Sequence, residues 1–166
     1  MGLTESDLDE HDTPPTLEGF ICLESNDPKR RVCTYVSDEL QFETIHYTGD
    51  LPCVVFHLAQ CTVAFIYSQF MKNKISQTEK MRRDDVMDFL HRFAGVARSR
   101  ASLHGDFNVD WTSSSITKNM IIAWSKDNDF QQLIKAPTRK SINNQGLKTN
   151  PLEFVPPHPV FYSRGS

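Results

Sequence analysis

Apolar residues follow two different periods along this chain, and the change of period predicts its elements. Apolar runs of the length of a single strand occur at 20–23, 32–36, 52–58 and 61–67. The last two runs are nearly uninterrupted, and only Ala59 and Gln60 separate them. This pattern predicts a tight hairpin whose strands are covered on both faces.

The period becomes helical near residue 76. Val86, Leu90, Phe93 and Ala97 fall at i, i+4, i+7 and i+11, which predicts an amphipathic helix over 76–100. A second helix is expected over 115–126. The apolar side chains that it should bury are Ile116, Met120, Ile121 and Trp124.

Shorter signals complete the order of elements. The chain opens with the end of a strand at 2–12, a strand beginning at Ser102 leads into Gly105, and a last strand is expected over 130–134. Strands, helix, strand, helix, strand indicate a layered α/β or α+β sandwich. From Lys140 to Ser166 the composition turns to Asn, Gly, Lys and Pro, so this segment is expected to be largely irregular.

Composition limits the class of protein. The 166 residues suit one domain, and the formal charge of -3 argues against a nonspecific polyanion binder while leaving room for a local basic patch. The four cysteines lack CxxC spacing, so we expect buried thiols in a reducing compartment rather than a zinc site. The acidic start and the lack of an apolar run of ~20 residues predict a soluble intracellular product without membrane contact.

The tetrapeptide Gly105-Asp106-Phe107-Asn108 is the main candidate for chemistry. Asp106 can orient an attacking water or accept its proton, and Asn108 lies two positions along, on the same side of an extended chain. An acceptor and a neutral donor at one point suit phosphodiester hydrolysis. The alternative is a simple turn, because Gly, Asp and Asn are the commonest turn residues.

Two further residues have a functional and a structural interpretation. Glu5 can present a carboxylate to magnesium at a strand end, or it can belong to a solvated acidic N-terminus. Tyr67 can donate its hydroxyl to a phosphate oxygen, or it can be a strand-end tyrosine with a buried ring. The six histidines show no metal-like spacing, and His57 and His104 are expected to be hydrogen-bonded core residues.

Five segments in order resemble the endonuclease/exonuclease/phosphatase superfamily, and within it the retrotransposon (non-LTR, LINE-like) endonuclease branch. The match covers roughly residues 2–155. The segments are Leu3-Thr4-Glu5-Ser6 with Leu8-Asp9; Gly19-Phe20 with Arg31 and 32–36; Val63 to Tyr67; Leu103 to Asn108; and Asp129 to Ile134 with Pro137-Thr138-Arg139.

The resemblance implies a fold and an activity. The fold would be a partial four-layer α/β sandwich of the DNase I-like type over 1–155, with an irregular tail at 156–166. The activity would be Mg²⁺-dependent nicking of DNA, with Mn²⁺ as the alternative ion, by part of a polyprotein that also carries a reverse transcriptase and acts in the nucleus. The implied roles are metal ligand for Glu5, catalysis for Asp106, Asn108 and Tyr67, and substrate binding for Arg31 and Arg139.

The departures from the family pattern are informative too. The family's Asn on a first strand and its Ser-Asp-His motif have no counterpart in these 166 residues. We therefore expect a sandwich lacking its first and its C-terminal strand, and weak or no catalysis by this polypeptide alone. The alternatives are an inactive relic of the same domain and a phosphatase acting on a small phosphorylated molecule.

Overall fold

The structure is a computed structural model that describes residues 1–4, 6, 8, 11–68, 76–109, 111, 114–132, 139–140, 154–155 and 161–163. Its elements, in chain order, are β1 (Gly2–Thr4), β2 (Phe20–Glu24), β3 (Val32–Ser37), β4 (Phe42–Ile45), β5 (Cys53–Leu58), β6 (Cys61–Tyr67), α1 (Ser76–Val96), β7 (Arg100–Asp106), α2 (Ile116–Asp127), β8 (Phe130–Gln132), β9 (Arg139–Lys140), β10 (Phe154–Val155) and β11 (Phe161–Ser163).

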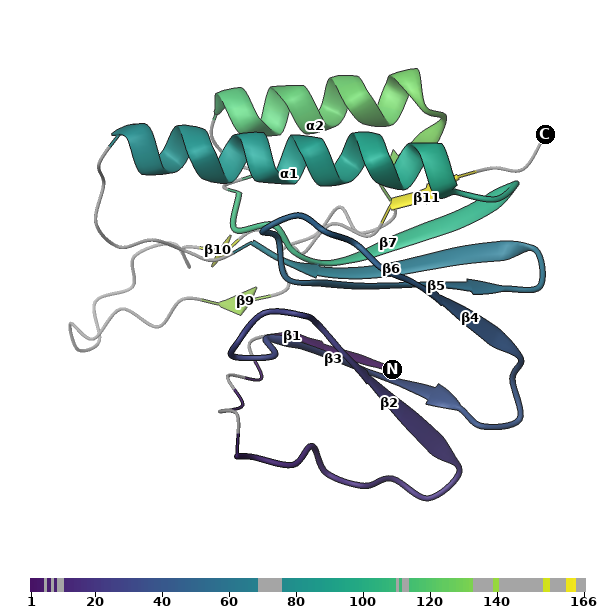
Figure 1. The fold of residues 1–166 in the computed structure, drawn as a ribbon. Coiled ribbons are helices and arrows are strands. Elements are labelled where there is room, and N and C mark those ends of the chain that lie inside the picture. Colours follow the sequence, from purple (N-terminus) through teal and green to yellow (C-terminus); the bar gives the residue numbers. More distant parts are fainter. Residues whose placement is uncertain are drawn as a thin grey trace.

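These elements form three layers (Figure 1). Helices α1 and α2 cover one face of a six-stranded sheet, and a three-stranded sheet lies against the other face. The larger sheet has the order β4-β5-β6-β7-β11-β8, and the smaller has the order β1-β3-β2. Only β6 and β7 pair in parallel among these strands, with α1 as the crossover between them. This is part of the layered sandwich that the sequence predicted.

The predicted β5–β6 hairpin is confirmed. Leu58 pairs with Cys61 across the two-residue turn. Val54 and Phe56 are buried between the two sheets, whereas Val55 faces the helices. The central strands are thus covered on both faces, which explains their continuous apolarity.

The predicted face of α2 is partly wrong. Ser115 caps the helix, since its side chain accepts the Lys118 N–H at 3.1 Å. Ile121 and Trp124 are buried as expected, but Ile116 is 66% exposed and Met120 is at the surface. The buried stripe follows the helical period through Thr117, Ile121, Trp124 and Ser125. Ile116 and Met120 precede this stripe by one residue, which turns them toward solvent.

The tail prediction is also wrong for six residues, because Lys140 lies in β9, Phe154–Val155 forms β10, and these two strands pair with each other. Phe161–Ser163 forms β11, which pairs antiparallel with β7 on one side and β8 on the other. Strand β4 was missed as well. The ends of the predicted strand at 130–134 and most of 140–166 lie outside the described residues. All four cysteines are free thiols, with Cys33 buried. In the part of the chain that is described, no helix is both long and apolar enough to cross a membrane.

Candidate functional site

Strands β6 and β7 end together at one edge of the larger sheet, where β1 also ends and β3 and β5 begin (Figure 1). Their parallel register pairs Tyr67 with Asp106. Two residues earlier on each strand, the Phe65 and His104 rings stack with centroids 5.0 Å apart on the side of the three-stranded sheet. Because side chains alternate along a strand, Tyr67 and Asp106 face the same side. The structure therefore brings these two predicted residues together.

Gly105 allows the strands to approach at this point. Its φ is +137°, a conformation that L side chains rarely adopt. An added Cβ would lie 2.0 Å from the carbonyl oxygen of Ile66 on the neighbouring strand. The glycine that the sequence singled out is thus required by both its backbone angle and its surroundings.

The turn after Gly105 is fixed by hydrogen bonds between the two strands. The Asp106 carboxylate accepts the Asn108 N–H at 2.8 Å, and the Asp106 carbonyl accepts the Ser68 N–H at 2.7 Å. The Asn108 amide nitrogen donates in turn to the Ser68 carbonyl. Asn108 itself has a left-handed φ of 47°. Phe107, 1% exposed, anchors the turn in the core.

This network orients the Asn108 amide. Because one N–H of the side chain is used by the Ser68 carbonyl, the amide oxygen and the second N–H are the groups that can meet a ligand. The sequence predicted Asn108 as a neutral donor; its geometry also offers an acceptor oxygen. Asp106 and Tyr67 are 5% and 7% exposed, and Asn108 is half-buried. A substrate would therefore reach the site at Asn108.

Ser68 is the residue that the sequence reasoning missed. It is fully buried, and its main chain holds both Asp106 and Asn108. Among the residues that the structure describes, none is a hydrogen-bond partner of its hydroxyl. The only signal in the sequence was its position directly after Tyr67.

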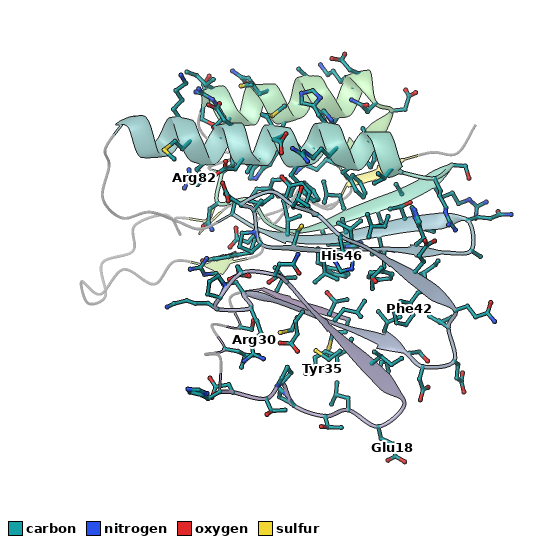
Figure 2. The ribbon with its side chains drawn as sticks, in the orientation of Figure 1. Glu18, Arg30, Tyr35, Phe42, His46 and Arg82 are labelled. Atoms are coloured by element: carbon teal, nitrogen blue, oxygen red, sulfur yellow. The ribbon has the colours of Figure 1, made fainter. Side chains whose placement is uncertain are left out.

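A second turn, Lys29-Arg30-Arg31, leads into β3. The Arg31 N–H donates to the Asp27 carboxylate at 3.1 Å, and the Arg31 guanidinium lies 3.7 Å from the same group. Arg30 pairs with Glu24 at 2.8 Å. Figure 2 shows Arg30 at the edge of the three-stranded sheet, on the side toward which β6 and β7 run. Both arginines thus have acidic partners close by in the sequence, Glu24 at the end of β2 and Asp27 in the loop that follows it.

Glu5 lies outside the described residues, so its role stays a prediction. Its neighbours reach the same edge, because Thr4 pairs with Val32 and the Ser6 N–H donates to the Arg31 carbonyl at 3.3 Å. The backbone of Arg139 lies in β9, also on this side (Figure 1), and its side chain is outside the described part.

The described residues do not by themselves form a metal site. No group of three or more His, Cys, Asp or Glu side chains that could hold an ion is found among them. The oxygens of Asp106 and Asn108 are nevertheless of the hard type that Mg²⁺ prefers. They fit such an ion only together with a further carboxylate.

The loop before β5 borders the site and is acidic. The Pro52 carbonyl accepts the Tyr67 N–H at 3.0 Å. Burial, and then the neighbouring charges of Asp50, Asp84 and Asp88, raise the pKa of Asp85 on α1. Burial, with Asp27 nearby, raises the pKa of the Cys53 thiol to about 12. Acidic residues thus lie close together on α1 and in this loop, and two of them, Asp84 and Asp88, pair with Arg83 and Arg92.

Several solved structures share the fold of this chain. The endonuclease domain of TRAS1, a telomere-specific non-LTR retrotransposon, matches with a TM-score of 0.55 and 10% identity over 89% of this chain and 68% of that one. The 3′ phosphatase NExo from Neisseria, bound to product DNA hairpin, matches with a TM-score of 0.65 and 13% identity over 98% and 75%. An AP endonuclease from Archaeoglobus fulgidus gives a TM-score of 0.65 and 12% identity over the same shares.

No protein-family model matches the chain, and no curated protein is similar to it in sequence. The structural matches agree with the resemblance carried by the sequence segments. The chain has the DNase I-like fold of the endonuclease/exonuclease/phosphatase proteins.

Proposed function

We propose that this chain is part of a nuclease domain of the retrotransposon endonuclease type, a domain that hydrolyses phosphodiester bonds in DNA. The observation that carries the proposal is the pairing of Tyr67 with Asp106 at the ends of two parallel strands, with Asn108 hydrogen-bonded to both strands. Reactive groups of α/β folds collect where parallel strands end. The polyprotein context, the reverse transcriptase and the nuclear location belong to the same proposal.

Each residue has a distinct role in this proposal. Asp106 orients the attacking water or accepts its proton, and Asn108 and Tyr67 hold the phosphate. Glu5 would complete the oxygen ligands of a Mg²⁺ or Mn²⁺ ion, which when bound acts as a Lewis acid on the phosphate. Arg31 and Arg139 would contact the substrate backbone.

The charge distribution favours one direction of approach. Asp50 in the loop before β5 lies close to Asp84, Asp85 and Asp88 on α1; Arg83 and Arg92 pair with two of these aspartates, and the remaining negative charge disfavours a polyanion there. The turn with Arg30 and Arg31 lies on the other sheet. We propose that the DNA backbone reaches Asn108 from the side of the three-stranded sheet.

A plasmid-nicking assay with Mg²⁺ tests the proposal, with two variants of Asp106. Asp106→Asn keeps an oxygen that can accept the Asn108 N–H but removes the carboxylate. We expect it to unfold at nearly the wild-type temperature and to nick roughly a hundredfold or more slowly. Asp106→Ala also removes the acceptor, so it should lose both nicking and about 1 kcal/mol of stability.

The outcomes separate the alternatives. Nicking that survives Asp106→Asn would contradict the proposed role of this residue. A folded wild-type chain that binds an oligonucleotide but never nicks it would support the non-catalytic relic. Turnover of a small phosphate ester without nicking would favour the phosphatase alternative. That alternative has some support, because one matching structure, with a TM-score of 0.51 and 12% identity, is described as a mannosyl-6-phosphatase.

A further inference from the structure

A hollow of about 400 Å³ lies between the C-terminal half of α1 and the end of β4. None of its lining residues belongs to the Asp106 turn or to the neighbouring strand ends. Its apolar walls are formed by Ile45, Val55, Phe89, Phe93 and Val96, and its polar rim by His46, Thr48 and Arg92. Figure 2 shows His46 beneath α1, where the chain leaves β4. The hollow is thus a separate feature of the molecule.

Aromatic rings form much of its wall. Tyr47 meets Phe89 edge to face with centroids 5.2 Å apart, and Phe89 stacks on Phe93 at 5.8 Å. These contacts fix the orientation of all three rings before any ligand arrives. Fixed rings favour a flat aromatic partner, which can stack or meet them edge to face.

One cation is held at the rim. The Nε of Arg92 lies 2.9 Å from Asp88, its Nη1 donates to Thr48 at 3.4 Å, and its guanidinium carbon lies 5.7 Å from the centroid of the Tyr47 ring. Asp88 engages the Nε side of the guanidinium. The opposite side carries N–H groups with the geometry that binds a carboxylate or sulfonate.

Open space remains beside the helix. A Cβ built at Gly95 would meet no heavy atom within 4 Å. The volume, the mainly apolar lining and the few polar groups match a site for a small molecule.

We propose that this hollow binds a small aromatic molecule carrying one anionic group. The aromatic part would lie against Ile45, Tyr47 and Val96, above the buried floor formed by Phe89 and Phe93, and the anion would meet the guanidinium of Arg92. The proposal does not depend on nuclease activity, because it concerns different residues and a different ligand.

A pair of fluorescent probes tests the proposal. Anilinonaphthalene sulfonate is an aromatic anion, and phenylnaphthylamine is its neutral counterpart. The wild-type chain should bind one equivalent of either probe, with the anion held more tightly. Arg92→Gln should weaken the anion about tenfold and leave the neutral probe unchanged. Arg100→Gln, which removes an exposed charge outside the hollow, is the matched control.

A second variant tests the space itself. Gly95→Leu places a side chain in the hollow and should abolish binding of both probes, whereas Gly95→Ala should retain it. Both changes favour helix formation, so the variants should still unfold cooperatively. Three results would each overturn the proposal. They are an equal loss of affinity for both probes in Arg92→Gln, unchanged probe binding in Gly95→Leu, and the absence of saturable probe binding to the folded wild-type chain. If Gly95→Leu does not fold, the binding of the two probes to Arg92→Gln is sufficient to test the proposal.

Discussion

Two turns at the same edge of the molecule are built in opposite ways. Each contains a non-glycine residue with a left-handed φ, 47° at Asn108 and 42° at Arg30. The Asn108 turn is held by its own side chains, by the neighbouring strand and by a buried phenylalanine, Phe107. The Arg30 turn is held by the ion pairs of Glu24 and Asp27 and by the hydrogen bonds that the Asp27 carboxylate accepts.

The difference shows which groups are fixed before a substrate binds. In the first turn, the hydrogen bonds that shape the backbone also orient Asp106 and Asn108, as preorganised catalysis requires. In the second turn, the charged groups hold the protein's own loop. Arg31 can contact a phosphate only in addition to Asp27 or in exchange for it. The first turn should therefore resist changes of solvent, and the second should respond to them.

Gly105→Ala should have the largest effect on the first turn. The substitution combines a φ of +137° with a Cβ 2.0 Å from the Ile66 oxygen. Backbone strain and overpacking together should cost about 3 kcal/mol or more of unfolding free energy. Urea denaturation measures this loss. Gly95→Ala, in open space on α1, is the control and should be neutral or stabilising by up to about 1 kcal/mol. Equal effects at both glycines would contradict the account of the β6–β7 approach.

Asp27→Ala should break the second turn at a smaller cost. Its carboxylate accepts the Ser25 hydroxyl and the Arg31 N–H and lies 3.7 Å from the Arg31 guanidinium. Losing the acceptor should cost about 2 kcal/mol, and Asp27→Asn, which keeps an oxygen, should cost less. The loss in Asp27→Ala should shrink at high salt, because screening already weakens the ion pair. The contrast between the two turns would be contradicted if Asp27→Ala and Asp27→Asn lost the same unfolding free energy and if this loss did not change with salt.

Elements whose pattern is local were predictable from the sequence. The β5–β6 hairpin is specified by two apolar runs and a two-residue gap, and α1 by its helical stripe. Strand β4 was missed because an edge strand with two exposed residues, Glu43 and Thr44, carries a weak pattern. Strand β11 was missed because its three residues are stabilised by β7 and β8, which lie far away in the sequence.

The site was predictable in its residues but not in its connections. Tyr67 and Asp106 could be named from their motifs, yet their pairing depends on the parallel register that α1 closes. The orientation of Asn108 depends on a main-chain carbonyl, which leaves no mark in the residue type of Ser68. Asp27 went unnoticed for a similar reason, since a turn aspartate reveals its partners only in three dimensions.

Acidification should give the smallest loss of unfolding free energy. We expect it to act through His104 in β7, the strand that leads to the Asn108 turn. Burial, and then the charge of the N-terminal ammonium, lower the pKa of His104. Above the ordinary histidine pKa both the folded and the unfolded chain are neutral at this position, so its contribution to stability is complete. As the pH falls below about 6.5, the unfolded chain binds a proton that the folded protein still refuses, and stability declines. We expect the unfolding free energy to fall between pH 7.5 and 5.5, with a shallower slope in His104→Gln. His91→Gln, on the exposed side of α1, should keep the wild-type slope. An unchanged slope in His104→Gln would show that this ring is not the group that couples protonation to the β7 strand.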